Sequence, residues 1–142
     1  MTAKQSLDIA SDHDVRMLVG HFYTRIREDA ELGPIFNDVS TIDWVDHIPT
    51  MCEFWETVLF HRTGYKGDPA SSHVQLDRLM FSSHGVGLRT NDFERWVAMF
   101  HETIDTLYSG PRAELAKRSA SRKARQLMDE ICRSRDLAED SH

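Results

Sequence analysis

The chain has 142 residues, of which 40% are hydrophobic and 28% are charged, a composition that suits one globular domain. Its formal net charge of −6 argues against a general nucleic-acid binder, because such proteins meet phosphates with basic surfaces. The two cysteines indicate neither a disulfide framework nor a zinc site. Residues 1–5 lack the apolar core of a secretory leader, so none is expected, and no apolar run reaches membrane-spanning length. We therefore expect a reduced, cytoplasmic protein that binds neither nucleic acid nor membrane.

The first strong helical pattern runs from about Asp12 to Asp29. Its apolar residues recur every three or four positions, so they share one face of the helix. That face consists of Val15, Leu18, Val19, Phe22 and Ile26. Tyr23 lies at its edge, and the Gly33–Pro34 step is expected to break the helix.

A second helical segment is expected to open at Ser40 and Thr41. Its apolar stripe consists of Trp44, Ile48, Met51, Trp55 and Val58. Pro49 lies within the stripe, and proline lacks an N–H and clashes with the carbonyl four residues back. We therefore expect a kink or a fresh helix start next to His47, followed by a loop over residues 62–67.

The pattern is weaker over residues 69–88. Pro69 suits the first position of a helix, which places His73 about one turn into it. A second short helix is expected to follow, and it would hold Leu79 and His84.

Two longer helices complete the pattern. Thr90 or Asn91 is expected to cap the first of them, with Asn91 and Glu94 forming a capping box. Its apolar face consists of Phe93, Trp96, Val97, Phe100, Ile104 and Leu107. Pro111 is expected to start the last helix. The apolar residues of that helix are Ala116, Ala120, Ala124, Leu127 and Ile131.

No segment alternates with the period of two that marks a strand, so the sequence predicts an all-α fold. We expect the domain to cover residues 11–135. Solvated tails are expected at residues 1–10 and 136–142.

Several motifs resemble those of the truncated haemoglobins, and most closely those of the third group of that family. They occur in the same order as in the family, from about Asp14 to Ile131. They are Phe22-Tyr23 with Leu32–Phe36, the segment His47–Trp55, the segment Gly64–His73, and the segment Leu88–Trp96. Each motif is weak alone, and together they are specific. The resemblance implies a two-over-two helical sandwich around haem b, the iron protoporphyrin IX cofactor.

The resemblance implies that His73 is the proximal ligand of the haem iron, because Leu76 completes the Gly-x-Pro-x-x-x-His-x-x-Leu pattern of the family. One departure leaves an alternative open. About ten residues, Asp77–Val86, stand between this motif and the next helix, and they contain a second histidine, His84. His84 lies closer in sequence to Trp96 and is the alternative ligand.

The resemblance also implies a distal group of three side chains. Tyr23 and Trp96 would donate hydrogen bonds to the diatomic ligand, although either side chain on its own also suits a packed core. His47 would gate the pocket, donate to the ligand, or bind iron as a sixth ligand. The expected haem-contacting residues are Phe36, Met51, Phe54, Trp55 and Tyr65. Arg62 and Lys66, with Tyr65, are expected near the haem propionates.

The expected function is therefore binding of O2, NO or CO at haem iron, as in oxygen transport or sensing. Consumption of nitric oxide or peroxide is a further expectation, and it would need electrons from a separate reductase. Whether the protein is an enzyme stays open. The residues alone also allow a haem-free helical module for interaction or regulation. A non-haem metal enzyme is a third reading, for which the sequence offers no H-E-x-x-H or paired Glu-x-x-His motif.

Overall fold

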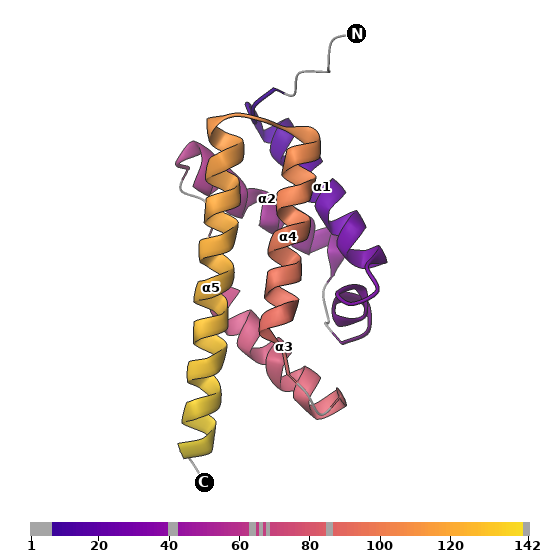
Figure 1. The fold of residues 1–142 in the computed structure, drawn as a ribbon, viewed down its shortest axis with the longest axis vertical. Coiled ribbons are helices and arrows are strands. Elements are labelled where there is room, and N and C mark those ends of the chain that lie inside the picture. Colours follow the sequence, from indigo (N-terminus) through magenta and orange to yellow (C-terminus); the bar gives the residue numbers. More distant parts are fainter. Residues whose placement is uncertain are drawn as a thin grey trace.

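The computed structural model describes residues 7–39, 43–62, 65, 67, 69–84 and 87–140, with the backbone alone at positions 38–39, 70–71, 82–84 and 138–140. Every regular element in these ranges is helical (Figure 1). The elements are α1 (Asp12–Glu28), the π-helical turn η1 (Ile35–Val39), α2 (Trp44–Phe60), α3 (Pro69–His84), α4 (Thr90–Leu107) and α5 (Pro111–Asp140). The all-α prediction is confirmed. None of these helices has the length and apolar character that a membrane crossing requires.

The helices form two packed pairs, one laid against the other. α1 packs on α2, and α4 packs on α5. The pairs meet because α1 also contacts α4 and α2 also contacts α5 (Figure 1). α3 packs against α5 and η1, so it closes one end of the arrangement. The result is a two-over-two helical sandwich.

An aromatic cluster forms the core between the pairs. All five residues of the predicted α1 face are buried, and Tyr23 is buried beside them. The Phe22 ring lies edge-on to Trp96 and Phe100, with centroids 5.3 and 4.9 Å away. Trp55 of α2 stacks on Phe100 at 4.7 Å. These rings join α1, α2 and α4, and they support the wall of the cavity described below.

Small side chains allow α4 and α5 to approach closely. Ala116 and Ala120 of α5 are fully buried, and the rest of the predicted α5 face is buried as well. α5 continues to Asp140, so residues 136–140 of the predicted C-terminal tail are helical, and Asp136 and Leu137 within it are exposed.

The residues just before α1 pack on the domain. Ile9 is fully buried in the core. The Asp8 carboxylate accepts hydrogen bonds from the backbone N–H groups of Arg112 and Ala113 at 3.0 and 2.9 Å, so it caps α5 from a distant part of the chain. The prediction of a solvated N-terminal tail is therefore wrong for Asp8 and Ile9.

α1 ends at Glu28, before the predicted break at Gly33–Pro34. Asp29 turns the chain there, because its carboxylate accepts hydrogen bonds from the backbone N–H groups of Glu31 and Leu32 at 3.1 and 2.9 Å. The turn made by the Asp29 side chain therefore ends α1, and Pro34 is not what ends it.

α2 is a single helix, so no fresh helix starts within it. The side chain of Asp43 caps it by accepting a hydrogen bond from Val45 N–H at 3.0 Å. The predicted openers, Ser40 and Thr41, lie outside the described residues. Pro49 is tolerated close to the helix start. The carbonyl that it deprives of a partner belongs to Val45, which is 80% exposed, so water can replace the missing N–H.

α3 is also one continuous helix, so the prediction of two short helices is wrong. Residues 77–84, the greater part of the segment that the sequence suggested as an insertion, extend this helix. α4 begins at Thr90 with Arg89 as its N-cap, so the predicted cap at Thr90 or Asn91 is one or two residues too late. The Asp92 carboxylate accepts from the backbone N–H of Arg89 at 2.9 Å, in place of the expected pairing between Asn91 and Glu94.

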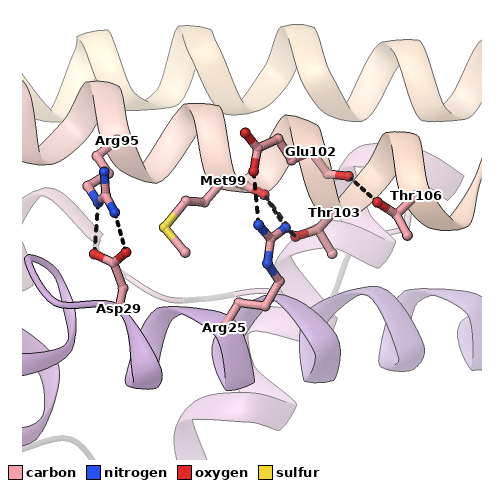
Figure 2. Close-up of polar contacts among 7 residues, drawn as sticks. All are labelled: Arg25, Asp29, Arg95, Met99, Glu102, Thr103 and Thr106. Carbon is pink, nitrogen blue, oxygen red and sulfur yellow. Dashed lines mark hydrogen bonds and ion pairs between the residues drawn. The ribbon is translucent and has the colours of Figure 1, made fainter.

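Two polar ties run along the contact of α1 with α4 (Figure 2). Arg25 donates to the hydroxyl of Thr103 at 2.8 Å and to the carboxylate of Glu102 at 2.9 Å. Arg95 forms a forked ion pair with the buried Asp29 carboxylate, at 2.8 and 2.5 Å. The fork reaches the same Asp29 that ends α1, so it fixes the position of that turn against α4.

Candidate cofactor site

A largely apolar cavity of about 430 Å³ lies between the helix pairs and α3. Its volume is within the range of ligand sites in proteins. Nine of the ten predicted site residues line it: Tyr23, Phe36, His47, Met51, Phe54, Trp55, Tyr65, His73 and Trp96. A second cavity, of about 440 Å³ between α1 and α4, is lined mainly by charged side chains and by neither of these histidines. The first cavity is therefore the candidate site.

The tenth residue, His84, is the last residue of α3, and its side chain lies outside the described part of the structure. Its backbone lies about 16 Å along the helix from that of His73, at a rise of ~1.5 Å per residue. One helix therefore cannot present both histidines at the same point of the cavity.

His73 stands one turn into α3. Its Nδ1–H donates to the Pro69 carbonyl oxygen at 2.6 Å, and its ring centroid lies 6.1 Å from that of Phe93. Burial lowers the pKa of His73 and so favours the neutral imidazole. The hydrogen bond to Pro69 has a smaller, opposite effect on this pKa. The bond to Pro69 fixes the tautomer and leaves Nε2 as the nitrogen available to a metal.

His47 faces the same cavity from α2. Its ring lies edge-on to Tyr23 and Trp44, with centroids 5.2 and 5.6 Å away. Its Nε2 is buried and has no hydrogen-bond partner among the described residues. Burial lowers the pKa of His47, and the charge of His73 lowers it further. A buried ring nitrogen without a hydrogen-bond partner costs free energy, so this arrangement favours a ligand in the cavity that contacts the nitrogen.

Tyr23 and Trp96 form a polar pair in this apolar surrounding. Burial raises the pKa of the Tyr23 hydroxyl, and a hydrogen bond from Trp96 offsets part of that rise. Indole is only a donor, so a hydrogen bond between these two side chains runs from the Trp96 N–H to the Tyr23 oxygen and leaves the Tyr23 O–H free to donate elsewhere. Trp44 also packs on Tyr23, at 5.5 Å, although its pattern predicted only a place on the apolar stripe.

Several lining residues were predicted as core or not at all. Leu76, Leu88, Phe93, Ala124 and Leu127 line the cavity, and the last three lie on the predicted apolar faces of α4 and α5. The spacing of these three residues placed them on inward faces but did not distinguish a cavity wall from a filled core.

Lys123 of α5 is the cationic side chain among the described lining residues, and sequence reasoning missed it. Its ammonium nitrogen lies 5.7 Å from the centroid of the Phe54 ring. Arg62, which was expected at the entrance, instead pairs with Asp12 of α1. Lys66 lies outside the described residues. A lysine on a helix surface carries no sequence signal of a cavity edge, because charged residues are typical there.

The two cysteines should differ sharply in reactivity. Cys52 is buried, and burial raises its pKa to about 11, with the negative charge of Glu56 adding to the rise. Cys132 is exposed. At pH 8 about a thousandth of Cys52 would be thiolate, the reactive form. We expect one iodoacetamide adduct on the native chain and two in denaturant, counted by mass spectrometry. Equal labelling of both thiols in the native protein would contradict the burial of Cys52.

No family model matches the chain. Over 102 residues, which are 70% of this chain and 73% of the relative, the sequence is 28% identical to a group 3 truncated hemoglobin of Campylobacter jejuni. The crystal structure of group III truncated hemoglobin from Campylobacter jejuni matches with a TM-score of 0.73 at 24% identity, covering 89% of this chain and 95% of that chain. This chain thus has the fold of a truncated haemoglobin, and in sequence it resembles the third group of that family.

Proposed function

We propose that the cavity binds haem b and that the protein binds diatomic gases at the haem iron. The observation that carries the proposal is a pair of imidazoles in one apolar cavity, with His73 Nε2 available and His47 Nε2 buried without a partner. The aromatic walls suit a flat apolar cofactor, and His73 suits the role of an axial ligand to its metal. Haem supplies the iron that binds O2, NO or CO.

The proximal side would be held by His73. Its hydrogen bond to Pro69 orients the ring and would increase the electron density of Nε2, the nitrogen that would bind the iron. His84, the alternative, is disfavoured by its place about 16 Å further along α3. The walls would be supplied by Phe36, Met51, Phe54, Trp55 and Tyr65.

The distal side would stabilise the bound gas through Tyr23. Donation from the Trp96 N–H to the Tyr23 oxygen would lower the pKa of the Tyr23 hydroxyl and make its O–H a stronger donor. We propose that Tyr23 is the direct donor and that Trp96 acts on the gas through Tyr23 or directly. His47 would supply a further neutral donor or an axial nitrogen. Donors of this kind hold O2 tightly, which favours retention or O–O activation over simple transport.

Turnover of nitric oxide or peroxide needs electrons, and we infer that a separate reductase supplies them in the cytoplasm. The free cysteines are compatible with such a reducing setting.

Lys123 is proposed to pair with a propionate of the haem, near Tyr65. Replacing Lys123 by Met keeps the aliphatic length and removes the charge. An ion pair at an open edge is worth at most about 1 kcal/mol, so haem loss should quicken about twofold to fivefold. The measurement is transfer of haem to excess apomyoglobin. Arg62→Met is the matched control, because Arg62 pairs with Asp12. Equal rates in the two variants would remove Lys123 from the cofactor site.

The proposal is tested by adding haemin to the purified, folded chain and recording the visible spectrum. A Soret band that saturates at one haem per chain is expected, and a pyridine haemochrome spectrum should identify haem b. The ferrous protein should then bind carbon monoxide with a sharp shift of that band. A chain that is helical by circular dichroism but gives no Soret band with added haemin would overturn the proposal in favour of a haem-free helical module.

A further inference from the structure

A buried carboxylate lies in the second half of α3. Asp77 is 6% exposed, and Arg135 of α5 grips it with Nε at 3.1 Å and Nη2 at 2.6 Å. Asp77 also accepts a hydrogen bond from the Leu88 N–H at 2.7 Å. The Leu88 carbonyl in turn accepts from Arg135 at 2.6 Å. Three parts of the chain therefore meet in one closed network, here named the Asp77 clamp.

Gly87 allows this network to close. A Cβ atom at that position would lie 2.1 Å from the Asp77 Oδ1 and 2.9 Å from the Arg135 Nη2. Glycine is therefore the residue that lets the backbone approach the ion pair so closely. The clamp rests on side chains from α3 and α5 and on the backbone just before α4.

The clamp lies one helical turn from the proposed iron ligand. Pro69, His73 and Asp77 are spaced four residues apart in α3, so they follow one another along the same face. Pro69 orients the His73 ring through its carbonyl, and Asp77 fixes the helix that carries the ring. Leu88, which the clamp also holds, lines the cavity.

We propose that Asp77 and Arg135 are positioning residues, which fix the height and tilt of His73 relative to the haem and so set the strength of the iron–histidine bond. This inference rests on the proposed function. α3 is also tied to α5 by an exposed hydrogen bond from Arg78 Nη2 to the Ser134 hydroxyl at 3.2 Å. The clamp differs in being buried and in holding α3 to α5 and to the backbone before α4 at once, so its loss would let α3 slide or tilt on α5. An ion pair with defined geometry restricts such movement, whereas its net effect on stability is small when compared with an apolar replacement.

The test compares Asp77→Asn, Arg135→Lys and Gly87→Ala with a matched control, Arg95→Lys. Arg95 makes the same forked pair with a buried aspartate, but between α1 and α4, away from α3. Lysine keeps the charge of arginine and loses the fork. Each protein is loaded with haem. The readouts are the iron–histidine stretching band of the ferrous form by resonance Raman, the rate of haem loss, and urea unfolding of the apoprotein.

The clamp variants should each shift and broaden the iron–histidine band, and they should lose haem at least about tenfold faster than the wild type. Arg95→Lys should lower the urea midpoint comparably while its iron–histidine band stays at the wild-type position. If one clamp variant fails to fold, the other two carry the comparison.

Two negative results have different meanings. Clamp variants with the wild-type band and the haem-loss rate of Arg95→Lys would show that the clamp is only structural, and the proposed function would stand. A wild-type chain that takes up no haem would instead refute the proposed function itself.

Discussion

Replacing His73 by Ala should abolish stable haem retention. The imidazole is the proposed axial ligand, and the cavity would then hold the cofactor only by apolar packing and by its edge contacts. The measurement is the haem content after gel filtration of the loaded variant, together with the loss of the iron–histidine stretch. Added free imidazole should restore part of the binding, because it can fill the space that the side chain leaves.

His84→Ala is the control for this result. The structure places the two histidines on the same helix but far apart, so the variant should keep its haem and its iron–histidine stretch. Haem retention by His73→Ala together with haem loss by His84→Ala would reverse the assignment. The additional residues of α3 would then supply the ligand.

Tyr23→Phe should speed O2 dissociation by roughly ten- to hundredfold. It removes a donor from a dry site, and a hydrogen bond to a partly charged acceptor is typically worth about 1.5–3 kcal/mol. The Tyr23 side chain is buried, so water cannot easily take its place. The rate is measured by stopped flow, with displacement of O2 by carbon monoxide. Unchanged O2 release would remove Tyr23 from the distal site.

Trp96→Phe should also speed O2 dissociation, and the size of its effect reveals its route. If Trp96 acts through its hydrogen bond to Tyr23, the double variant should release O2 no faster than Tyr23→Phe alone. If it donates directly to the gas, the two effects should multiply. Carbon monoxide, which carries less negative charge, should respond less in every variant. Equal effects on both gases would point to a change of pocket size.

Strong periodicity made α1, α4 and α5 predictable. The predicted faces of α1 and α5 are buried, because each helix packs one stripe against the core. The match is partial for α4, where Phe100 and Ile104 of the predicted face are buried and its other four residues are half-buried. Met99 and Thr103 of α4 are buried without having been predicted.

α3 has no such stripe, and its helical continuation depends on contacts with α5. Asp77 looks solvent-facing in the sequence, and its partner Arg135 lies 58 positions away. Pairing over that distance leaves no local signal.

The cavity was predictable where a motif marked it. His47, His73 and Tyr23 were found through their spacing and the family resemblance, and all three line the cavity. The effect of Trp96 on the pKa of Tyr23 could not be predicted, because it depends on how two helices cross. Lys123 was not predicted as a lining residue, because a lysine on a helix has the sequence pattern of a solvated residue.

The capping of α5 by Asp8 has a consequence for how the chain folds. The two hydrogen bonds that make this cap join residues 104 and 105 positions apart in sequence. Contacts of such long separation carry a high loop-closure entropy and are expected to form late. During synthesis the apolar face of α1 leaves the ribosome before its partner α4 exists, and Asp8 then has no helix to cap. Aggregation should therefore threaten nascent chains more than the finished protein.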